Sequence, residues 1–321
     1  MSFNQMILKN QYLKVKGLGD RLVLMKEQID WKPFIPIIKS VYNDDKIIGG
    51  RPHTSELVIV RSLLLQAWYG LSDLELEFAC NDRLSFRNFL DFSDNIPDFS
   101  TLWVAREKLS RSGKLDLIWN ELQYQLDKKG YSIKKGVIQD ATFIESDLGK
   151  KRSYKEKKAE EKGEKIEYSS KQLSHIDKDA TFSIKNNQIH FGYKNHIKID
   201  IDHELIRVFK TTTASLHDNQ IDLSKKNEVM YRDRGYTGKE TIAKGNATMK
   251  RGKLNTKNKL RNLRISKTRA HSERPFAVIK NVFSGVRTRV KNIFRVNCKE
   301  LFKCFAYNLY QLVTLEKKKL A

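Results

Sequence analysis

The residues of this sequence with the clearest capacity for chemistry surround a single acid in a strongly basic stretch. Between Lys244 and Lys299 there are 17 lysines and arginines but only one acid, Glu273. At about 100° per residue, Arg269 and Lys280 fall on the same helix face as Glu273. A carboxylate between two cations could hold a metal ion beside a phosphate. The plainer alternative is a surface helix whose i, i+4 ion pair contributes roughly 0.2–0.5 kcal/mol.

Two further acids end short apolar runs that are typical of buried strands. Asp140 ends the run Gly136–Asp140, and Asp233 ends the run Val229–Asp233. We expect both acids at the C-terminal ends of strands, where functional side chains gather in sheets flanked by helices. Three carboxylates at one point repel one another unless cations lie among them, and hard oxygen ligands suit Mg²⁺ or Mn²⁺. Two such ions, about 3.5–4 Å apart, would activate an attacking oxygen and stabilise the leaving oxygen of a phosphodiester.

The distribution of charge indicates a polyanionic partner. The chain of 321 residues has a formal net charge of +23. Residues 1–130 carry 18 basic and 17 acidic groups, whereas residues 131–321 carry 43 basic and 21 acidic groups. Such a one-sided field suits nucleic acid. An anionic membrane surface is the alternative, but no basic amphipathic helix with an aromatic face supports it.

Composition indicates a soluble globular protein with room for two domains. Hydrophobic residues make up 40% of the chain and charged residues 31%. There is no apolar run of about 18 residues that would predict a membrane span, and the N-terminus lacks the apolar segment of a signal peptide. Cys80, Cys298 and Cys304 show neither pairing nor metal-ligand spacing, so we expect reduced core thiols in a cytoplasmic protein.

Residues 1–131 are predicted to form a helical domain. Thr54 is expected to cap a buried helix, and Ser72 begins a capping box with Glu75. Helices are expected at Leu57–Trp68, Ser72–Cys80, Ser85–Phe92, Ser100–Leu109 and Leu115–Lys129. The short helices could form a helix-turn-helix for DNA ends, although the region is nearly neutral and such packing is common without DNA. The tryptophans are expected in the core: Trp31, Trp68, Trp103 and Trp119.

Residues 132–321 are predicted to form a mixed α/β domain. The almost purely charged run Lys150–Glu167 indicates a solvated insertion, placed at about 147–188, with no core to bury. Further strands are expected at Ile189–Ile201, Glu204–Thr213 and Ala247–Lys250. The stretch up to Lys267 is predicted to be a basic linker, followed by the helix of Glu273 and a last helix at Lys299–Leu315.

Taken in order, these motifs resemble those of DDE insertion-sequence transposases. Asp-Ala-Thr at Asp140, Asp-Arg-Gly-Tyr at Asp233 and R-x-x-x-E-x-x-x-x-x-x-K around Glu273 are similar to the signatures of that family. The runs Phe191–His196 and Thr213–Asp218 also resemble its connecting strands, and the resemblance covers roughly residues 50–315.

Two features depart from the family pattern. Ser266 stands where many relatives have a tyrosine, three residues before Arg269. Only 40 residues separate Asp233 from Glu273, so any insertion before the glutamate is short or absent. Pro275 follows Glu273 closely, and it either belongs to the first turn of a helix capped by Ser272 or kinks a longer helix. Both alternatives place the carboxylate near a helix N-terminus.

The resemblance implies an RNase H-like mixed sheet flanked by helices, preceded by the helical domain, and the activity of a DNA transposase. Asp140, Asp233 and Glu273 would be catalytic and would hold two Mg²⁺ or Mn²⁺ ions. Water would cut at the ends of the element, and the freed 3′-hydroxyl would attack target DNA. DNA contacts are expected at Arg269, Lys280, Arg234, Lys194 and Arg264.

The implied partners are double-stranded DNA, as terminal inverted repeats and as target, and a second copy of the chain on that DNA, with no membrane and a nucleoid-associated, cytoplasmic location. One alternative is a metal nuclease of the same fold that cleaves without joining strands. The other is a transposase-derived DNA-binding protein without catalysis, against which the three intact acids argue. Nearby ionisable residues are expected to be structural or to face solvent: His196, His217, His271, Glu145 and Asp147.

Overall fold

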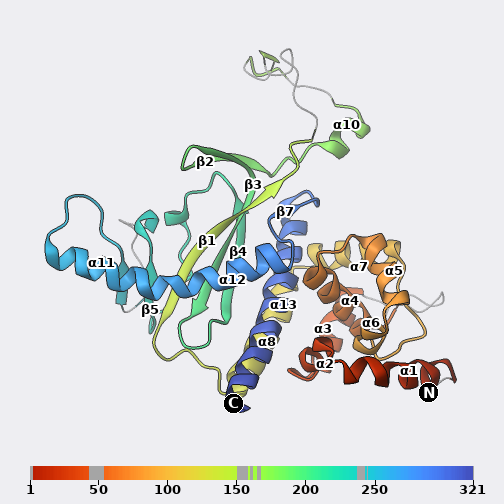
Figure 1. The fold of residues 1–321 in the computed structure, drawn as a ribbon. Coiled ribbons are helices and arrows are strands. Elements are labelled where there is room, and N and C mark those ends of the chain that lie inside the picture. The colour runs from red at the N-terminus through yellow and green to blue at the C-terminus, as the bar shows by residue number, and fades with distance from the viewer. Residues whose placement is uncertain are drawn as a thin grey trace.

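The structure is a computed structural model that describes residues 3–42, 54–149, 158–159, 162–164, 168–236, 243 and 245–320. Most of the charged run Lys150–Glu167 lies outside these ranges. Figure 1 shows the N-terminal helices gathered beside a twisted sheet, with the long C-terminal helix α13 (Ile293–Leu320) between them. The predicted fold class, a mixed sheet flanked by helices and preceded by a helical region, is confirmed.

The N-terminal region is helical, as predicted. Its helices are α1 (Phe3–Gly17), α2 (Arg21–Lys26), α3 (Phe34–Tyr42), α4 (Glu56–Tyr69), α5 (Asp73–Asp82), α6 (Leu84–Phe89), α7 (Phe99–Arg111) and α8 (Leu115–Lys128). The capping box is present, because Ser72 accepts from the Glu75 amide while the Glu75 carboxylate accepts from the Ser72 amide. The predicted cap at Thr54 is wrong. Helix α4 begins at Glu56, so that Ser55 is the N-cap residue, and no side-chain hydrogen bond caps the helix.

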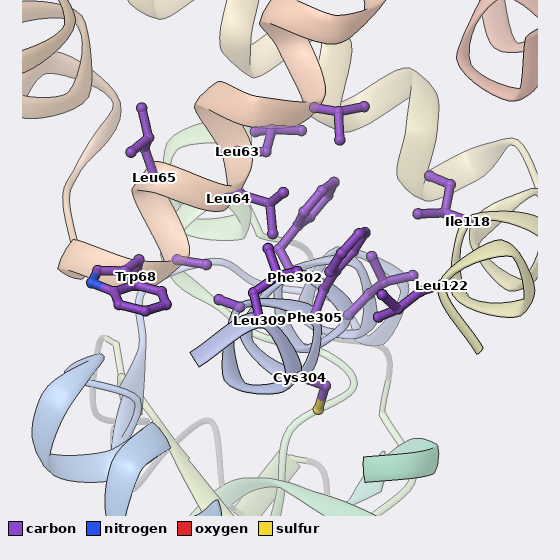
Figure 2. Close-up of a cluster of buried hydrophobic side chains, with 14 of the residues drawn as sticks. Leu63, Leu64, Leu65, Trp68, Ile118, Leu122, Phe302, Cys304, Phe305 and Leu309 are labelled. Atoms are coloured by element: carbon purple, nitrogen blue, oxygen red, sulfur yellow. The ribbon is translucent and has the colours of Figure 1, made fainter. Parts of the chain in front are cut away.

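The main hydrophobic core lies where α13 meets the N-terminal helices. Figure 2 shows Leu64 and Trp68 of α4 and Ile118 of α8 around Phe302 and Phe305 of α13. The aromatic side chains of Trp31 and Phe305 stack with their ring centroids 6.3 Å apart. This packing joins the helical region to the sheet, because the other face of α13 lies against strand β4 (Ile206–Thr213).

Two predictions about core residues have different outcomes. All three cysteines are buried free thiols, as expected. Three of the four tryptophans are also buried. The prediction that Trp103 lies in the core is wrong, because 48% of its surface is exposed. Trp103 lies on α7, whose buried side is formed by Leu102, Ala105 and Leu109. Apolar spacing therefore located the helix without identifying which of its faces is covered.

The sheet contains both parallel and antiparallel strands, and β1 lies at its centre. Its main path runs β2-β3-β1-β5-β6, with β4 also paired to β3 and the short strand β7 paired to β1. Strands β1 and β3 are antiparallel, while β5 and β6 continue parallel to β1. Besides β4, the strands are β1 (Val137–Ser146), β2 (Thr181–Lys185), β3 (Gln188–Asp200), β5 (Val229–Arg232), β6 (Gly245–Thr248) and β7 (Arg287–Thr288).

The position of Asp140 within β1 corrects the sequence prediction. Asp140 was expected at the end of a strand, but β1 continues to Ser146 because residues up to Glu145 still pair with β3. The parallel pairing of β1 with β5, however, ends at Ile138 and Tyr231. Asp140 therefore lies two residues beyond the last pair on β1, at the point where the two strands separate.

The segment after the sheet is more helical than predicted. The expected basic linker forms α11 (Thr256–Arg269), which Asn255 caps by accepting from the Asn258 amide. A 3-10 turn (Ala270–Ser272), α12 (Glu273–Ala277) and a π-helical turn (Val278–Val282) follow without a break. The short helix α10 (Ser170–His175) precedes β2. The last helix, α13, begins at Ile293, earlier than predicted.

No single helix in the described ranges is long and apolar enough to cross a membrane. Helices α4 and α5 are together long and apolar enough to span a membrane, but the chain bends by 107° between them.

Candidate catalytic site

Asp140 and Asp233 occupy matching positions on neighbouring parallel strands. Val137 pairs with Met230 and Ile138 with Tyr231, and the same offset carried two residues further matches Asp140 with Asp233. Asp233 directly follows β5, as predicted. Burial raises the pKa of the Asp140 carboxyl, and the charge of the nearby Asp233 adds to that rise. The sheet therefore brings together two acids that are 93 residues apart.

Both oxygens of Asp140 accept hydrogen bonds. The Arg269 guanidinium donates to Oδ2 at 2.9 Å, and the Ser272 hydroxyl donates to the same oxygen at 3.0 Å. The Ala141 amide donates to Oδ1 at 2.9 Å. Burial is the main cause of the raised pKa of Asp140, and the Arg269 charge opposes it. The carboxylate is thus oriented by α11 and the turn after it.

Asp233 is oriented by the chain that follows it. The Gly235 amide donates to Asp233 Oδ1 at 2.7 Å. A Cβ atom added to Gly235 would lie 2.9 Å from the same oxygen, so a side chain there would press on the carboxylate. Tyr236 is buried, and the Arg232 guanidinium lies over its ring, 5.6 Å from the centroid. The Asp-Arg-Gly-Tyr motif therefore forms one compact turn.

Glu273 begins α12, in the segment that contacts Asp140. It directly follows Ser272, and its side chain is exposed. The alternative in which the Ser272 side chain caps this helix is wrong, because its hydroxyl donates to Asp140 and to the Arg269 carbonyl instead. The other alternative, a longer irregular helix, agrees with the unbroken run from α11 through the 3-10 turn into α12. Within the described ranges, no three His, Cys, Asp or Glu side chains lie close enough to hold a metal ion as they stand. The structure thus brings two of the three predicted acids together and places the third directly after Ser272, which contacts Asp140.

The donors present suit a hard divalent cation. Asp140 and Asp233 supply carboxylate oxygens, the ligands that Mg²⁺ and Mn²⁺ prefer. Their mutual repulsion helps to raise the pKa of Asp140, and a cation placed between them would relieve it. Asp140 Oδ2 already takes a cationic partner, Arg269, which indicates that this position favours positive charge.

The predicted DNA-contacting residues have different environments. Burial is the main cause that lowers the pKa of Lys280, and the nearby charges of Glu145 and Asp140 oppose this effect. Arg234 and Arg264 are exposed, the first directly after Asp233 and the second on α11. Lys194 is buried, and its ammonium donates to Asp218 at 2.9 Å and to the Leu216 carbonyl at 2.8 Å. That pair joins the two motifs that resemble connecting strands of the family.

A basic pocket of about 670 Å³ lies beside α11. Its rim carries Lys250, Lys257, Arg261 and Arg264, and its described lining contains no acid. Arg261 is fixed by donating to the Thr248 carbonyl at 2.7 Å. The helix itself has six cations and no acid among its 14 residues, and its C-terminal residue, Arg269, contacts Asp140. A cationic surface therefore leads up to the acids.

A larger cleft of about 1350 Å³ lies between α4, α5, the β2–β3 hairpin and β7. Glu145, near the end of β1, lines it. The Glu145 side chain is only partly exposed, at 29%, and its carboxylate lies 2.6 Å from His190 Nδ1, while Asp147 is exposed as predicted. This cleft lies further along β1 than Asp140.

Sequence reasoning missed two residues that surround the acids. The Ser272 hydroxyl donates to Asp140, a role that the sequence reasoning did not assign to it. Its position three residues after Arg269, on the same side of a helical turn, could have indicated this shared contact. The Glu204 carboxylate lies 2.7 Å from His271 Nδ1 and forms an ion pair with Arg274 at 3.4 Å, and no local pattern marks it. His196 and His217 are structural as expected, since His196 contacts Thr212 at 2.9 Å and His217 caps a 3-10 turn.

Comparison with known families gives two matches. The model of a transposase domain, DUF772, matches residues 10–108, and the model of a transposase DDE domain matches residues 131–309. The second match covers more than half of the chain and includes all three predicted acids. No solved structure matches the chain.

Proposed function

Because this chain belongs to the transposase DDE domain family, we propose that it cuts DNA at the ends of a mobile element and joins the freed ends to target DNA. That the chain is a transposase follows from the two family matches. The proposal adds the reaction, the catalytic residues and the partners. The observation that carries it is the matching position of Asp140 and Asp233, with Arg269, four residues before Glu273, donating to Asp140.

In the proposed site, Asp140, Asp233 and Glu273 would hold two divalent ions, Mg²⁺ or Mn²⁺, which would supply positive charge for the attacking and leaving oxygens. Ser272 and the Ala141 amide keep the Asp140 carboxylate in one orientation. The Gly235 amide does the same for Asp233. The protein then contributes mainly position and electrostatic stabilisation, as is usual for phosphoryl transfer.

Arg269 and Lys280 flank Glu273 and bind the phosphates of the strand to be cut. Arg269 is held at Asp140 in the protein alone and exchanges this partner for a phosphate when DNA arrives. Arg234 and Arg264 extend the contact on either side because both are exposed. In the first reaction, water attacks a phosphodiester and its 3′ oxygen leaves as a hydroxyl. In the second, that hydroxyl attacks a target phosphodiester and displaces another 3′ oxygen.

The partners are duplex DNA with the inverted repeats of the element, target DNA, and a second copy of the chain that acts on the other end. The cations of α11 and the basic pocket support a polyanionic partner. Cutting two ends together requires two active sites, which supports a homodimer on DNA.

A strand-transfer assay tests the proposal. Duplexes that carry the inverted repeats flanking the gene are incubated with the protein, Mg²⁺ and a supercoiled target plasmid. Joined products are expected, and Asp140→Asn or Asp233→Asn should abolish them while keeping end binding. Cleavage without joining would favour the nuclease alternative. End binding without cleavage under Mg²⁺ or Mn²⁺ would favour the non-catalytic one.

A further inference from the structure

The direction of the Glu273 side chain depends on an unusual segment of helix. α11 ends at Arg269, a 3-10 turn covers Ala270–Ser272, and a π-helical turn follows α12 at Val278–Val282. Each change of hydrogen-bond spacing rotates the side chains that follow it, and such irregular turns recur at functional sites. The orientation of Glu273 is therefore set by whatever holds this segment in place.

Two acids hold the segment from different sides. Asp140 takes Arg269 and Ser272, as described above. Glu204 takes the next pair, because its Oε1 lies 2.7 Å from His271 Nδ1 and its Oε2 lies 3.4 Å from Arg274. The partners of Glu204 thus stand immediately on either side of the Ser272–Glu273 step.

Glu204 is itself firmly anchored. It lies in the turn between β3 and β4 with φ of +57°, a left-handed backbone conformation that is unfavourable for residues other than glycine. Its amide donates to the Asp200 carbonyl at 3.1 Å, and its carbonyl accepts from the Tyr307 hydroxyl at 2.9 Å. Only 19% of its side chain is exposed. A strained residue that is held at both backbone groups suits a fixed support.

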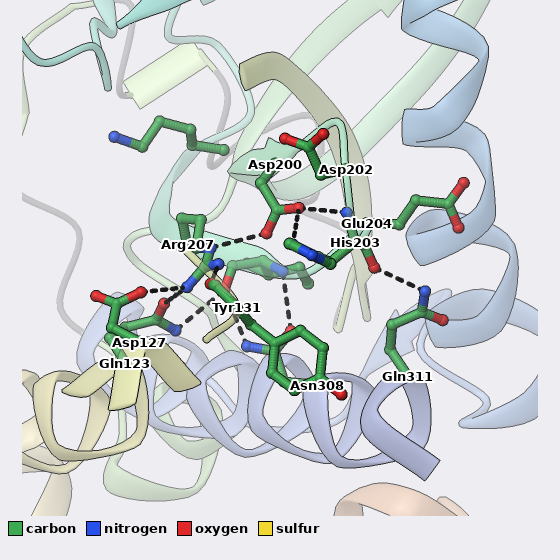
Figure 3. A network of polar contacts seen from close by, with 12 residues as sticks. Gln123, Asp127, Tyr131, Asp200, Asp202, His203, Glu204, Arg207, Asn308 and Gln311 are labelled. Carbon is green, nitrogen blue, oxygen red and sulfur yellow. Dashed lines mark hydrogen bonds and ion pairs between the residues drawn. The ribbon is translucent and has the colours of Figure 1, made fainter. Parts of the chain in front are cut away.

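The surroundings of Glu204 separate its side chain from the rest of the turn. Figure 3 shows its carboxylate pointing away from the ion pair of Asp200 and Arg207. That pair joins the same turn to α8, where Asp127 and Gln123 also contact Arg207. The turn is therefore braced by other contacts, which leaves the Glu204 carboxylate to the Glu273 segment.

We propose that Glu204 is a positioning residue that fixes the orientation of Glu273 through His271 and Arg274. This inference rests on the proposed function, in which Glu273 completes the site for divalent ions. Displacement of a reacting group by about 1 Å can cost on the order of 10²-fold in rate. Glu204 also offsets the positive charge of Arg274, so its loss leaves the DNA-binding surface more cationic.

The test compares Glu204→Gln with Asp202→Asn. Asp202 lies two residues earlier in the same turn, but it accepts from the amides of Lys134 and Lys135 at 3.2 and 2.9 Å. Figure 3 shows the two side chains leaving the turn in different directions. Each variant removes one carboxylate charge at nearly constant size, so differences between them report on the Glu273 segment.

Three quantities are measured for each variant: Mn²⁺ affinity without DNA by electron paramagnetic resonance, end-DNA affinity without metal, and the rate of cleavage at saturating DNA. For Glu204→Gln we expect Mn²⁺ affinity to fall by roughly 10–100-fold, as for other supports of metal ligands. We expect cleavage to fall similarly while DNA binds as tightly as before or more tightly. Asp202→Asn should stay close to the parent in all three. Equal behaviour of the two variants would overturn the proposal.

Two additions keep the result decisive. If Glu204→Gln does not fold, His271→Gln removes the 2.7 Å contact from the exposed side, and unchanged Mn²⁺ affinity and cleavage would overturn the proposal. Asp140→Asn is assayed in parallel. If it cleaves like the parent, the proposed function itself fails. If it is inactive while Glu204→Gln behaves like the parent, only the role of Glu204 is refuted.

Discussion

The Arg269 guanidinium donates to Asp140 Oδ2 at 2.9 Å, which joins the residue that we assign to the DNA strand with a residue that we assign to the metal. In the proposed reaction the same carboxylate would serve two partners in turn, Arg269 in the protein alone and a divalent ion during catalysis. Binding of DNA would draw Arg269 towards a phosphate and free that oxygen. We therefore propose that this pair couples arrival of the substrate to completion of the site.

Replacing Arg269 with glutamine should tighten Mn²⁺ binding in the absence of DNA by roughly 10-fold, equivalent to about 1.4 kcal/mol. The physical reason is that a guanidinium no longer competes for Asp140, whose neighbour Asp233 still favours a cation. Electron paramagnetic resonance titration measures the change. Lys267→Gln is the control, because it removes the same charge from an exposed position of α11. Equal Mn²⁺ affinity in the parent and Arg269→Gln would contradict the competition.

Salt dependence tests whether α11 carries the DNA. Each phosphate contact adds about 0.9 to the slope of log K against log salt for duplex DNA. Replacing Lys257, Lys259 and Arg264 with glutamine should flatten that slope by about 0.9 for each cation that contacts a phosphate. Lys14→Gln with Lys16→Gln, in the last turn of α1, serves as the control and should change it little. A flatter slope in the control alone would move the DNA path to the N-terminal helices.

The contact between α7 and α13 should depend on pH. The Arg295 guanidinium donates to both oxygens of Glu107, at 2.6 and 3.0 Å, and these hydrogen bonds hold the pKa of Glu107 below its usual value although burial opposes them. A depressed pKa contributes stability above the unfolded value of 4.5, and this contribution is lost as pH falls through the folded value.

Glu107→Gln should therefore lower the free energy of unfolding at pH 7 by about 1–3 kcal/mol. The difference from the parent should shrink as the pH is lowered below the ordinary glutamate range. Urea unfolding at a series of pH values measures it, with Asp82→Asn at the exposed end of α5 as the control. A difference that stays constant down to acid pH would show that the ion pair is not its source.

Local pattern was sufficient to predict several of the elements but not how the strands pair. The apolar run before Asp233 predicted β5, and the capping box at Ser72 predicted α5. Asp140 was placed at a strand end because the residues after it are less apolar, yet they pair with β3 across the sheet. Alternation along one strand carries no information about where a neighbouring strand stops.

The rest of the site depends on contacts between distant residues. Glu204 and His271 are 67 positions apart, and a lone glutamate in a turn has no distinguishing sequence pattern. The basic stretch before Arg269 was predicted as a linker because it has many cations and few apolar residues. The structure shows that one of those few, Ile265, is buried on the packed face of α11. Both errors arise because tertiary contacts, rather than local composition, decide which face of an element is covered.

Replacement of Glu273 by glutamine tests the central claim most directly, with end binding and end cleavage measured on the same DNA. Glu273 is the single acid among 17 cations between Lys244 and Lys299, so its loss should leave metal-free binding unchanged or tighter. Cleavage with Mg²⁺ should fall by roughly 100-fold or more, since even weaker disruption of metal sites costs ~10–100-fold. Cleavage at the parental rate by Glu273→Gln would contradict the account, because another acid would then have to complete the site.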